Sequence, residues 1–338
     1  LHDDTTKTAP LLKMTDADGF GVNAAVKWEN VTVDLSKVTT ATDAAKIQGK
    51  NTYTLMRGAN NKLKFSDYAA RYGTYAGVYE TGLRTDTGTN TATEVLYDVN
   101  RFKDGRVTYT AASTGEALGG YSAFGNTTTG NQLTVSGVTG TLAAAYGAQT
   151  AGSAGGSVNN KVTVAGTGTG SVTNVYGGAI TNAANAADVT GNTVTITGGT
   201  VTDAVYGGHT VGTGKTMGNA VNIGDGSAAT LAAGTNLDNA VLYGGNKADD
   251  VTGNTLNVMV KDAKAQKAQN FENYTFHLTD HIAANKPKSG TIDDTFTRNT
   301  GTMLTLANGF DGQTADWNKV TVDTSKLSAD KTLGAITL

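Results

Sequence analysis

The chain of 338 residues carries 26 lysine and arginine against 29 aspartate and glutamate side chains, a formal net charge of −3 at pH 7, and has 44 glycines, two prolines and no cysteine. Nucleic-acid binding needs a basic surplus that contacts phosphates, so this charge excludes nucleic acid as a partner. The scarcity of proline excludes collagen and proline-rich linkers, and the lack of any run of about 18 apolar residues excludes a transmembrane helix.

Residues 1–104 show the least regular pattern. The tyrosines Tyr68, Tyr72, Tyr75 and Tyr79 have the spacing of one helical face, but the surrounding residues alternate only briefly and carry several glycines. We expect this part to form irregular N-terminal coils of the same fold as the rest of the chain. The tyrosines are then expected in a loop or a degenerate coil.

Residues 105–278 contain a repeated unit, which is clearest at 191–208, where it reads G-N-T-V-T-I-T-G-G-T-V-T-D-A-V-Y-G-G. Its first half places Val194 and Ile196 on one face and threonines on the other, as in a strand with one buried side. The paired glycines that follow allow tight corners. The tyrosines that close successive units lie 30, 30 and 37 residues apart, at Tyr146, Tyr176, Tyr206 and Tyr243.

This period indicates an array of stacked repeats. One unit cannot bury its apolar face alone, but stacked units share a row of valine, isoleucine and leucine side chains. We therefore expect an all-β protein whose strands lie in register as a β-solenoid. The pattern predicts that one residue of each unit lies above the next, namely Leu133, Val162, Val194, Val221 and Leu256.

An asparagine precedes the strand of each unit, at Asn131, Asn160, Asn192, Asn219 and Asn254. Stacked amides could form a hydrogen-bonded ladder along the axis, as identical side chains do in cross-β assemblies. Equally, each asparagine could serve only its own turn, because asparagine accepts positive φ and bonds its own backbone. The residues alone leave both interpretations open.

The tyrosine column allows two orientations. If Val205 points inward, Tyr206 points outward, and the column is an exposed aromatic stripe of the kind that often forms a contact surface. If a bulge at Asp203 and Ala204 reverses the alternation, the tyrosines stack inside the core. We favour structural stacking and keep the four tyrosines as a candidate contact stripe.

The C-terminal part is expected to differ from the repeats. Residues 261–269 are good helix formers without an apolar stripe, which favours a short solvated helix or an inserted loop. Residues 279–298 are predicted to be a polar connection. Residues 317–326 then resemble 28–37 at an offset of 289 residues. We therefore expect 299–338 to begin a second large repeat unit, continuous with the same solenoid, in a longer parent protein.

Patterns that carry catalysis or metal binding are missing from the sequence. His277 and His281 lack the intervening glutamate of a zinc-protease helix, and Asp249 and Asp250 lack the repeated pattern of a calcium β-roll. We expect no catalytic residue, no metal and no cofactor, and thus no enzyme. A polysaccharide-active β-helix enzyme, with a site assembled from separate coils, stays an alternative.

The run Asn-Thr-Val-Thr-Ile-Thr-Gly-Gly-Thr-Val at 192–201 and the Val-Tyr-Gly-Gly closings resemble the passenger region of monomeric autotransporters, the type V secretion proteins of Gram-negative bacteria. The resemblance is best from 105 to 260. It implies a right-handed parallel β-helix with loop insertions, displayed outside the cell by a parent protein that a C-terminal barrel anchors in the outer membrane. It also implies an adhesin that binds a protein or glycan of host cells or bacteria, or itself.

Loops on a rigid scaffold usually carry binding. We therefore expect contacts first at the irregular insertions 80–103 and 261–290, and second at the tyrosine column. The alternative to an adhesin is a structural spacer without a ligand of its own.

Overall fold

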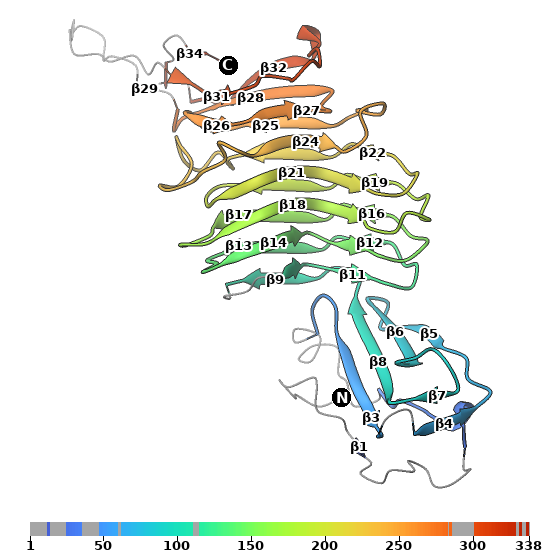
Figure 1. The fold of residues 1–338 in the computed structure, drawn as a ribbon. Coiled ribbons are helices and arrows are strands. Elements are labelled where there is room, and N and C mark those ends of the chain that lie inside the picture. The colour runs from blue at the N-terminus through green and yellow to red at the C-terminus, as the bar shows by residue number, and fades with distance from the viewer. Residues whose placement is uncertain are drawn as a thin grey trace, which may run out of the picture.

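The computed structural model describes residues 12–13, 25–35, 47–59, 62–110, 115–282, 284–285, 301–328, 331–332 and 336–337. These residues form an all-β protein, in which the helical content is limited to the 3-10 turns η1 (Trp28–Asn30) and η2 (Trp317–Lys319). None of the described helices has the length and apolar character needed to span a membrane. Most strands belong to parallel sheets. Strands of successive repeats are stacked along one axis, so each sheet runs along this axis (Figure 1).

Sheet 1 is the first long parallel sheet, and its strands follow one another in the order of the chain. Its members in the described residues are β9 (Arg106–Tyr109), β13 (Gln132–Ser136), β17 (Lys161–Gly166), β20 (Thr193–Ile196), β23 (Ala220–Ile223), β25 (Thr255–Val258), β28 (Asn273–Thr279) and β32 (Val320–Lys326).

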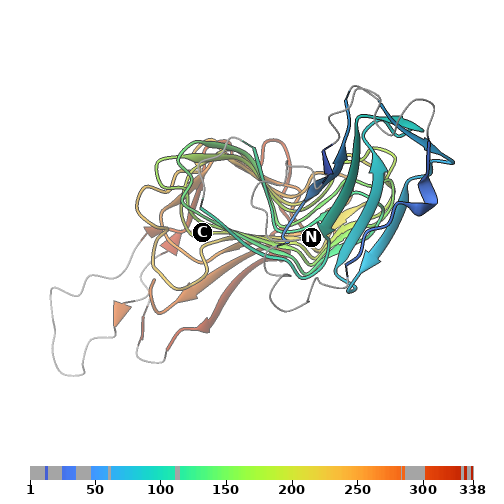
Figure 2. The ribbon, with the colours of Figure 1, turned by 90° about the horizontal axis from the view of Figure 1, so that it is seen from below.

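Sheets 2 and 3 run beside sheet 1 with the same parallel order. Sheet 2 contains β10 (Glu116–Leu118), β11 (Tyr121–Ser122), β14 (Thr141–Tyr146), β15 (Gln149–Thr150), β18 (Ser171–Ile180), β21 (Val201–Thr210), β24 (Val241–Gly245) and β27 (Lys267–Gln269). Sheet 3 contains β12 (Thr128–Thr129), β16 (Ser157–Val158), β19 (Val189–Thr190) and β22 (Thr216–Met217). Seen along the stack, the strands of successive repeats overlie one another (Figure 2).

The core of the stack is a set of aliphatic rows. Leu133, Val162, Val194, Val221 and Leu256 are paired in register from strand to strand, so the alignment predicted from the sequence is confirmed. Each of these side chains is at most 1% exposed. Sheet 2 faces this row with the inward residues of its own strands, and the whole forms one continuous hydrophobic cluster.

Residues 52–101 differ from the irregular coils that we expected. Together with residues 12–13 they supply the strands of a mostly antiparallel sheet, which lies below the first repeat in Figure 1 and has its own buried cluster. Tyr75 and Tyr79 face each other across a hairpin whose turn residues, Ala76 and Gly77, both have positive φ. The tyrosine spacing therefore reflects a tight turn between strands and not a helical face.

The elements of this N-terminal unit are short. The antiparallel sheet consists of β1 (Leu12–Lys13), β3 (Thr52–Arg57), β8 (Glu94–Arg101), β6 (Tyr79–Thr85) and β5 (Arg71–Tyr75). A second small sheet contains β2 (Val26–Lys27), β4 (Leu63–Ser66) and β7 (Thr91–Ala92).

A buried carboxylate joins the N-terminal unit to the stack. Glu80 on β6 is fully buried and accepts hydrogen bonds from Ser122 Oγ at 2.8 Å and Asn126 Nδ2 at 3.1 Å, both of which belong to the first repeat. The backbone N–H groups of Ala123 and Phe124 also donate to this carboxylate. Four donors of the stack thus converge on one side chain of the neighbouring unit.

The end of the stack also departs from expectation at residues 261–269. These residues form β26 (Ala263–Ala265) and β27, and not a helix or a protruding loop. Ala263, Ala265 and Ala268 are buried, because alanine is small enough for the narrow core and pairing with neighbouring strands overrides its helix propensity. Most of the polar connection predicted at 279–298 lies outside the described residues.

The remaining strands pair in twos near the C-terminal end. They are β26 with β31 (Leu304–Leu306), β29 (Ala284–Asn285) with β33 (Lys331–Thr332), and β30 (Gly301–Thr302) with β34 (Ile336–Thr337). β32 pairs in parallel with β28, so Val320–Lys326 continues sheet 1.

Candidate functional site

The five repeated asparagines form a buried ladder at the corner between sheets 3 and 1. Each of the first four donates from Nδ2 to Oδ1 of the next, at 2.8 Å from Asn131 to Asn160, 3.1 Å from Asn160 to Asn192, 3.1 Å from Asn192 to Asn219 and 3.4 Å from Asn219 to Asn254. The same Oδ1 accepts the backbone N–H of the preceding asparagine at 2.9 to 3.1 Å. All five side chains are fully buried.

The ladder asparagines do not adopt the turn conformation themselves. Positive φ falls on the residue before each of them, namely Gly130, Asn159, Gly191, Gly218 and Gly253. Each asparagine also donates to a backbone carbonyl of the adjoining corner, as Asn192 does to Ser157 O at 2.8 Å. The amides therefore tie sheet 3 to sheet 1 and one repeat to the next.

The closing glycines pack directly against this ladder. A Cβ at Gly178 would lie 2.5 Å from both Asn192 Oδ1 and Ser157 Oγ, although Gly178 has no positive φ. The requirement for glycine here is thus one of space. Sheet 2 approaches the ladder so closely that no side chain fits between them.

Gly178→Ala is expected to lower the free energy of unfolding by roughly 1–3 kcal/mol, because the added methyl group must displace buried ladder atoms. Gly166→Ala is the matched control, since Gly166 also lies in a strand without positive φ and a Cβ there meets nothing within 4 Å. Urea denaturation of both variants measures the difference. Equal stability of the two would show that the corner has room to spare.

The four tyrosines of sheet 2 stack on one another outside the main core, where Tyr146 is buried in a small cluster of its own and the other three are half-buried. Their ring centroids are 4.7 Å apart between Tyr146 and Tyr176, 5.2 Å between Tyr176 and Tyr206, and 4.7 Å between Tyr206 and Tyr243, with planes within 8° of parallel. Val205 lies in the main core, and its neighbour Tyr206 is half-buried on the opposite face. The tyrosines stack, but on the face opposite the main core, so the core column that we favoured is wrong.

A bulge occurs at the position that we considered from the sequence, next to Ala204 on β21, but it does not turn the tyrosines toward the core. The pairing between β18 and β21 shifts between Val172 and Asn174, opposite Val201 and Ala204. After the shift the alternation resumes in register, with Tyr176 beside Tyr206.

His209 is part of the same face and was not singled out from the sequence. Its ring lies edge-on to Tyr176 and Tyr206, with centroids 5.2 and 5.0 Å away. Burial, together with the nearby charge of Lys247, lowers the pKa of His209 to about 4, so the imidazole is neutral at pH 7. The equivalent residues in the preceding repeats are Ala179 and Gln149, so no repeat pattern marks this position.

The hydroxyls of Tyr146, Tyr176 and Tyr206 keep their protons at neutral pH. Burial, with a smaller contribution from the neighbouring Tyr243, raises the pKa of Tyr206 to about 12. Burial also raises the pKa values of Tyr176 and Tyr146, where the charges of Asp203 and Glu116 add to the effect. The column thus presents uncharged hydroxyl groups, which can donate and accept hydrogen bonds.

The two insertions that we expected to carry contacts are mostly not loops. Residues 80–103 are largely the buried strands β6 and β8, and 261–279 belong to strands of the stack. For the strand residues the expectation of irregular loops is wrong, because their apolar side chains fill cores, whereas residues 86–91 form an exposed turn between strands. The contacts expected at these segments stay a prediction. Residues 283 and 286–290 lie outside the described part of the chain.

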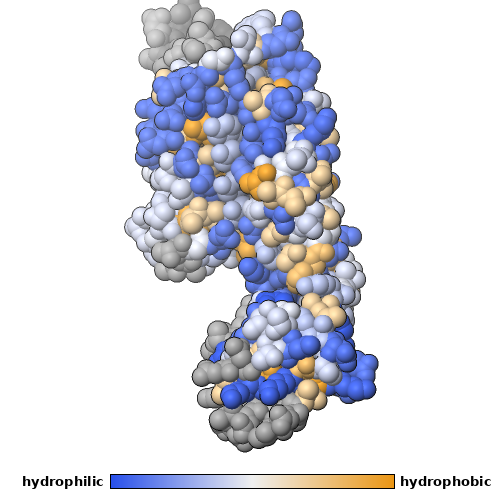
Figure 3. All heavy atoms as spheres, turned by 45° about the vertical axis from the view of Figure 1, so that its right-hand side comes forward, coloured by the Kyte–Doolittle hydropathy of each residue, from blue (hydrophilic) through white to orange (hydrophobic). Residues whose placement is uncertain are grey.

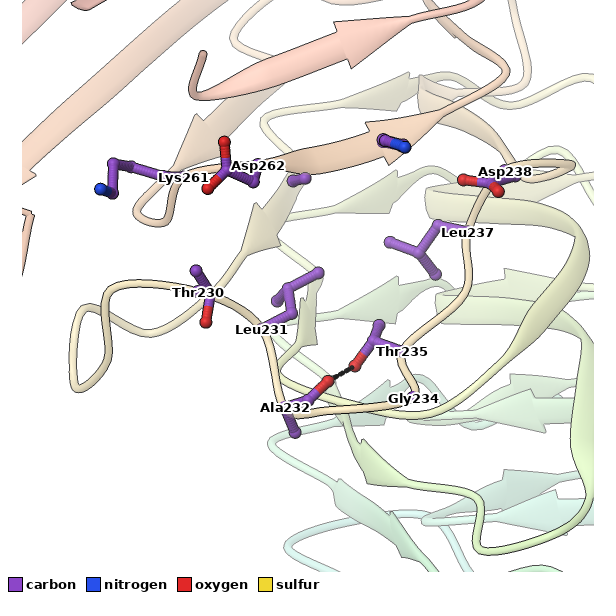
Figure 4. A pocket seen from close by; sticks show the side chains of 11 residues that line it. Thr230, Leu231, Ala232, Gly234, Thr235, Leu237, Asp238, Lys261 and Asp262 are labelled. Carbon is purple, nitrogen blue, oxygen red and sulfur yellow. Dashed lines mark hydrogen bonds between the residues drawn. The ribbon is translucent and has the colours of Figure 1, made fainter. Parts of the chain in front are cut away.

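A surface hollow of about 300 Å³ lies between the loop at 230–238 and β26 (Figure 4). Leu231 and Leu237 point into the space between the loop and the strand, and Lys261, Asp262 and Asp238 lie at its margins. Opposite charges line the same opening, so the hollow shows no preference for an anion or a cation. It lies between two successive repeats, since Thr230 pairs in parallel with Lys261, and its lining comes from these two repeats.

The His, Asp and Glu side chains of the described residues do not gather at one point. No cluster of three His, Asp or Glu side chains there could hold a metal ion. His277 instead bonds Asp323 Oδ2 at 2.8 Å and Asn257 Oδ1 at 3.2 Å, in an outward polar row on sheet 1. His277 and His281 therefore do not act as a pair.

No protein-family model, no curated protein and no solved structure matches this chain. A function is therefore inferred from the sequence pattern and from the geometry of the molecule. On the face shown in Figure 3, hydrophilic residues and small apolar patches alternate along the stack.

Proposed function

We propose that the three parallel sheets close into a right-handed parallel β-helix, and that this β-helix is the passenger of a monomeric autotransporter, displayed on a Gram-negative cell as an adhesin. Two facts support the fold. Strands of sheets 3, 1 and 2 follow one another in this order in successive repeats. Connections between parallel strands of one sheet are almost always right-handed.

The tyrosine column carries the proposal of adhesion. It repeats one chemical group at a nearly constant spacing on an outer face, so a ligand with repeated features can make many weak contacts that act together. The ring faces are covered by neighbouring rings, which leaves edges and hydroxyls for a ligand. Protonated hydroxyls suit hydrogen bonds to a glycan or a polar protein surface of a host or bacterial cell.

Replacing Tyr176, Tyr206 and Tyr243 together by phenylalanine is expected to weaken cell binding of the purified chain by about tenfold or more, since each lost hydroxyl contact contributes roughly 0.5–1.5 kcal/mol. The stacking is kept, so the melting temperature should stay within a few degrees of the wild type. Tyr72→Phe is the control, because Tyr72 is 58% exposed but lies outside the column.

The outcomes separate the alternatives. Full binding by the triple variant would remove the column from the contact. A wild-type chain that binds neither cells nor glycans would favour a spacer, and shortened glycan products would favour an enzyme.

A further inference from the structure

One short motif occurs twice in the chain with the same local fold. Trp28–Asn30 and Trp317–Lys319 are both 3-10 turns, and in each the N–H of the following valine donates to the tryptophan carbonyl. The cap residues agree as well, with φ/ψ of −80/109 at Val31 and −91/118 at Val320. The sequence repeat at an offset of 289 residues is therefore also a structural repeat.

The second copy is part of a stack. β32 pairs in parallel with β28, which places Val320 beside Tyr274 and Val322 beside Phe276. Tyr274 and Phe276 belong to the continuous core, so the two valines occupy the inward positions of one more repeat. The second copy of the motif is thus the turn and strand with which a stack ends.

The first copy has no such strand beneath it. Residues 31–35 join no sheet in the described part of the chain, although the equivalent residues 320–324 belong to β32. Val31 and Val33, the counterparts of Val320 and Val322, pack instead against the core of the antiparallel unit. The first copy therefore shows how the antiparallel unit covers the apolar side chains of a strand that elsewhere ends a stack.

The tryptophan of the first copy is held by many contacts. Trp28 is only 2% exposed and packs against Phe65 and Tyr68, with ring centroids 5.1 and 4.9 Å away. Its Nε1 donates to Ala69 O at 2.7 Å. The Arg71 guanidinium lies 5.7 Å from the ring centre and donates to Trp28 O at 3.3 Å. We call Phe65, Tyr68, Ala69 and Arg71 the tryptophan cradle.

The antiparallel unit has a second attachment, on a different element. The cradle residues lie on β4, on β5 and between these two strands, whereas Glu80 lies on β6 and accepts from Ser122 and Asn126 of the following stack. One small unit thus holds the ending motif of a stack with its cradle and the first repeat of a stack with Glu80.

We propose that the antiparallel unit is a connector between two successive β-stacks of one chain. The tryptophan turn that ends the preceding stack sits in its cradle, and Glu80 holds the stack that follows. Residues 25–35 then represent the end of a preceding stack, and Trp317 is the residue on which the connector of the next large repeat sits. The tyrosine column takes no part, so this inference is independent of the proposed cell binding.

The order of the chain agrees with this arrangement. The cradle residue Ala69 follows Trp28 by 41 residues, so the equivalent cradle for Trp317 belongs to the next large repeat. In the described residues, Trp317 is accordingly 77% exposed and borders an open pocket of about 450 Å³. Burying an indole against aromatic rings and a guanidinium stabilises such a contact.

A lengthened chain tests the connector. At the offset of 289 residues Leu338 corresponds to Gly49, so a second copy of residues 50–282, added after Leu338, continues the repeat without a gap. The added residues contain no tryptophan, and Trp317 is the sole emitter once Trp28→Phe is introduced. We expect the emission of Trp317 to move to shorter wavelength than in the Trp28→Phe chain without the addition. Acrylamide quenching should fall several-fold, because the exposed fraction drops from 77% toward the 2% of Trp28.

Arg71 provides the matched pair of variants. Arg71→Ala in the added copy should reverse part of the change in emission and quenching, whereas the same substitution in the original copy should leave Trp317 as it is. Sedimentation velocity over a concentration series checks that the change occurs within monomers. Emission and quenching of Trp317 that stay the same in the lengthened chain would overturn the proposal, as would a change that appears only when the chain dimerises.

Discussion

Glu80→Ala is expected to lower the free energy of unfolding by about 3–5 kcal/mol and to uncouple the N-terminal unit from the stack. The carboxylate is fully buried and accepts from donors on both sides of the junction, including Asn100 Nδ2 at 2.9 Å on its own unit. Alanine leaves these buried donors without an acceptor. An unsatisfied buried donor costs about 1–3 kcal/mol, and bonds to a charged acceptor are the stronger ones.

Calorimetry separates the loss of stability from the uncoupling of the N-terminal unit and the stack. The N-terminal unit and the stack have separate hydrophobic clusters, so loss of the link should split one unfolding transition into two. Glu29→Ala is the control, because Glu29 lies in the same unit with an exposed side chain that pairs only loosely with Lys27, at 3.7 Å. A single transition at the wild-type temperature in Glu80→Ala would show that other contacts hold the junction.

The stack was predictable from the sequence because its chemistry repeats. Val194 and Ile196 alternate with threonine, and the strands from β13 to β25 keep both positions aliphatic, so register and core follow there from the side-chain period alone. The asparagines also repeat from unit to unit, and this repetition suggested a ladder as one of two interpretations. The preceding residue, a glycine in four of the five repeats, was the missed signal, since it takes the positive φ that the turn interpretation had assigned to the ladder asparagine.

The N-terminal unit was not predictable in the same way. A spacing of four between Tyr75 and Tyr79 fits a helical face as well as a two-strand hairpin, and only long-range pairing with β8 decides between them. No sequence motif marks Glu80, because the partners Asn100 and Asn126 lie 20 and 46 residues away in the chain. His209 was missed since its position varies from repeat to repeat.

The second large effect is expected in the ladder, where Asn192→Ala should lower the free energy of unfolding by about 2–4 kcal/mol. Asn192 is a middle rung that donates to Ser157 O and Asn219 Oδ1 and accepts from the backbone and the side chain of Asn160. Alanine removes all four bonds, leaves the buried Asn160 N–H without its acceptor and opens a small cavity.

Asn222→Ala is the matched control for this rung. Asn222 lies on the same sheet one repeat later and also bonds neighbouring strands, at 3.2 Å to Thr195 Oγ1 and 2.8 Å from Asn257 Nδ2, but it is half-buried on the outer face. Water can replace its bonds, so its loss should cost at most about 1 kcal/mol. Urea denaturation of the two variants gives the comparison. Equal losses would mean that the aliphatic rows, and not the buried amides, hold sheets 3 and 1 together at this corner.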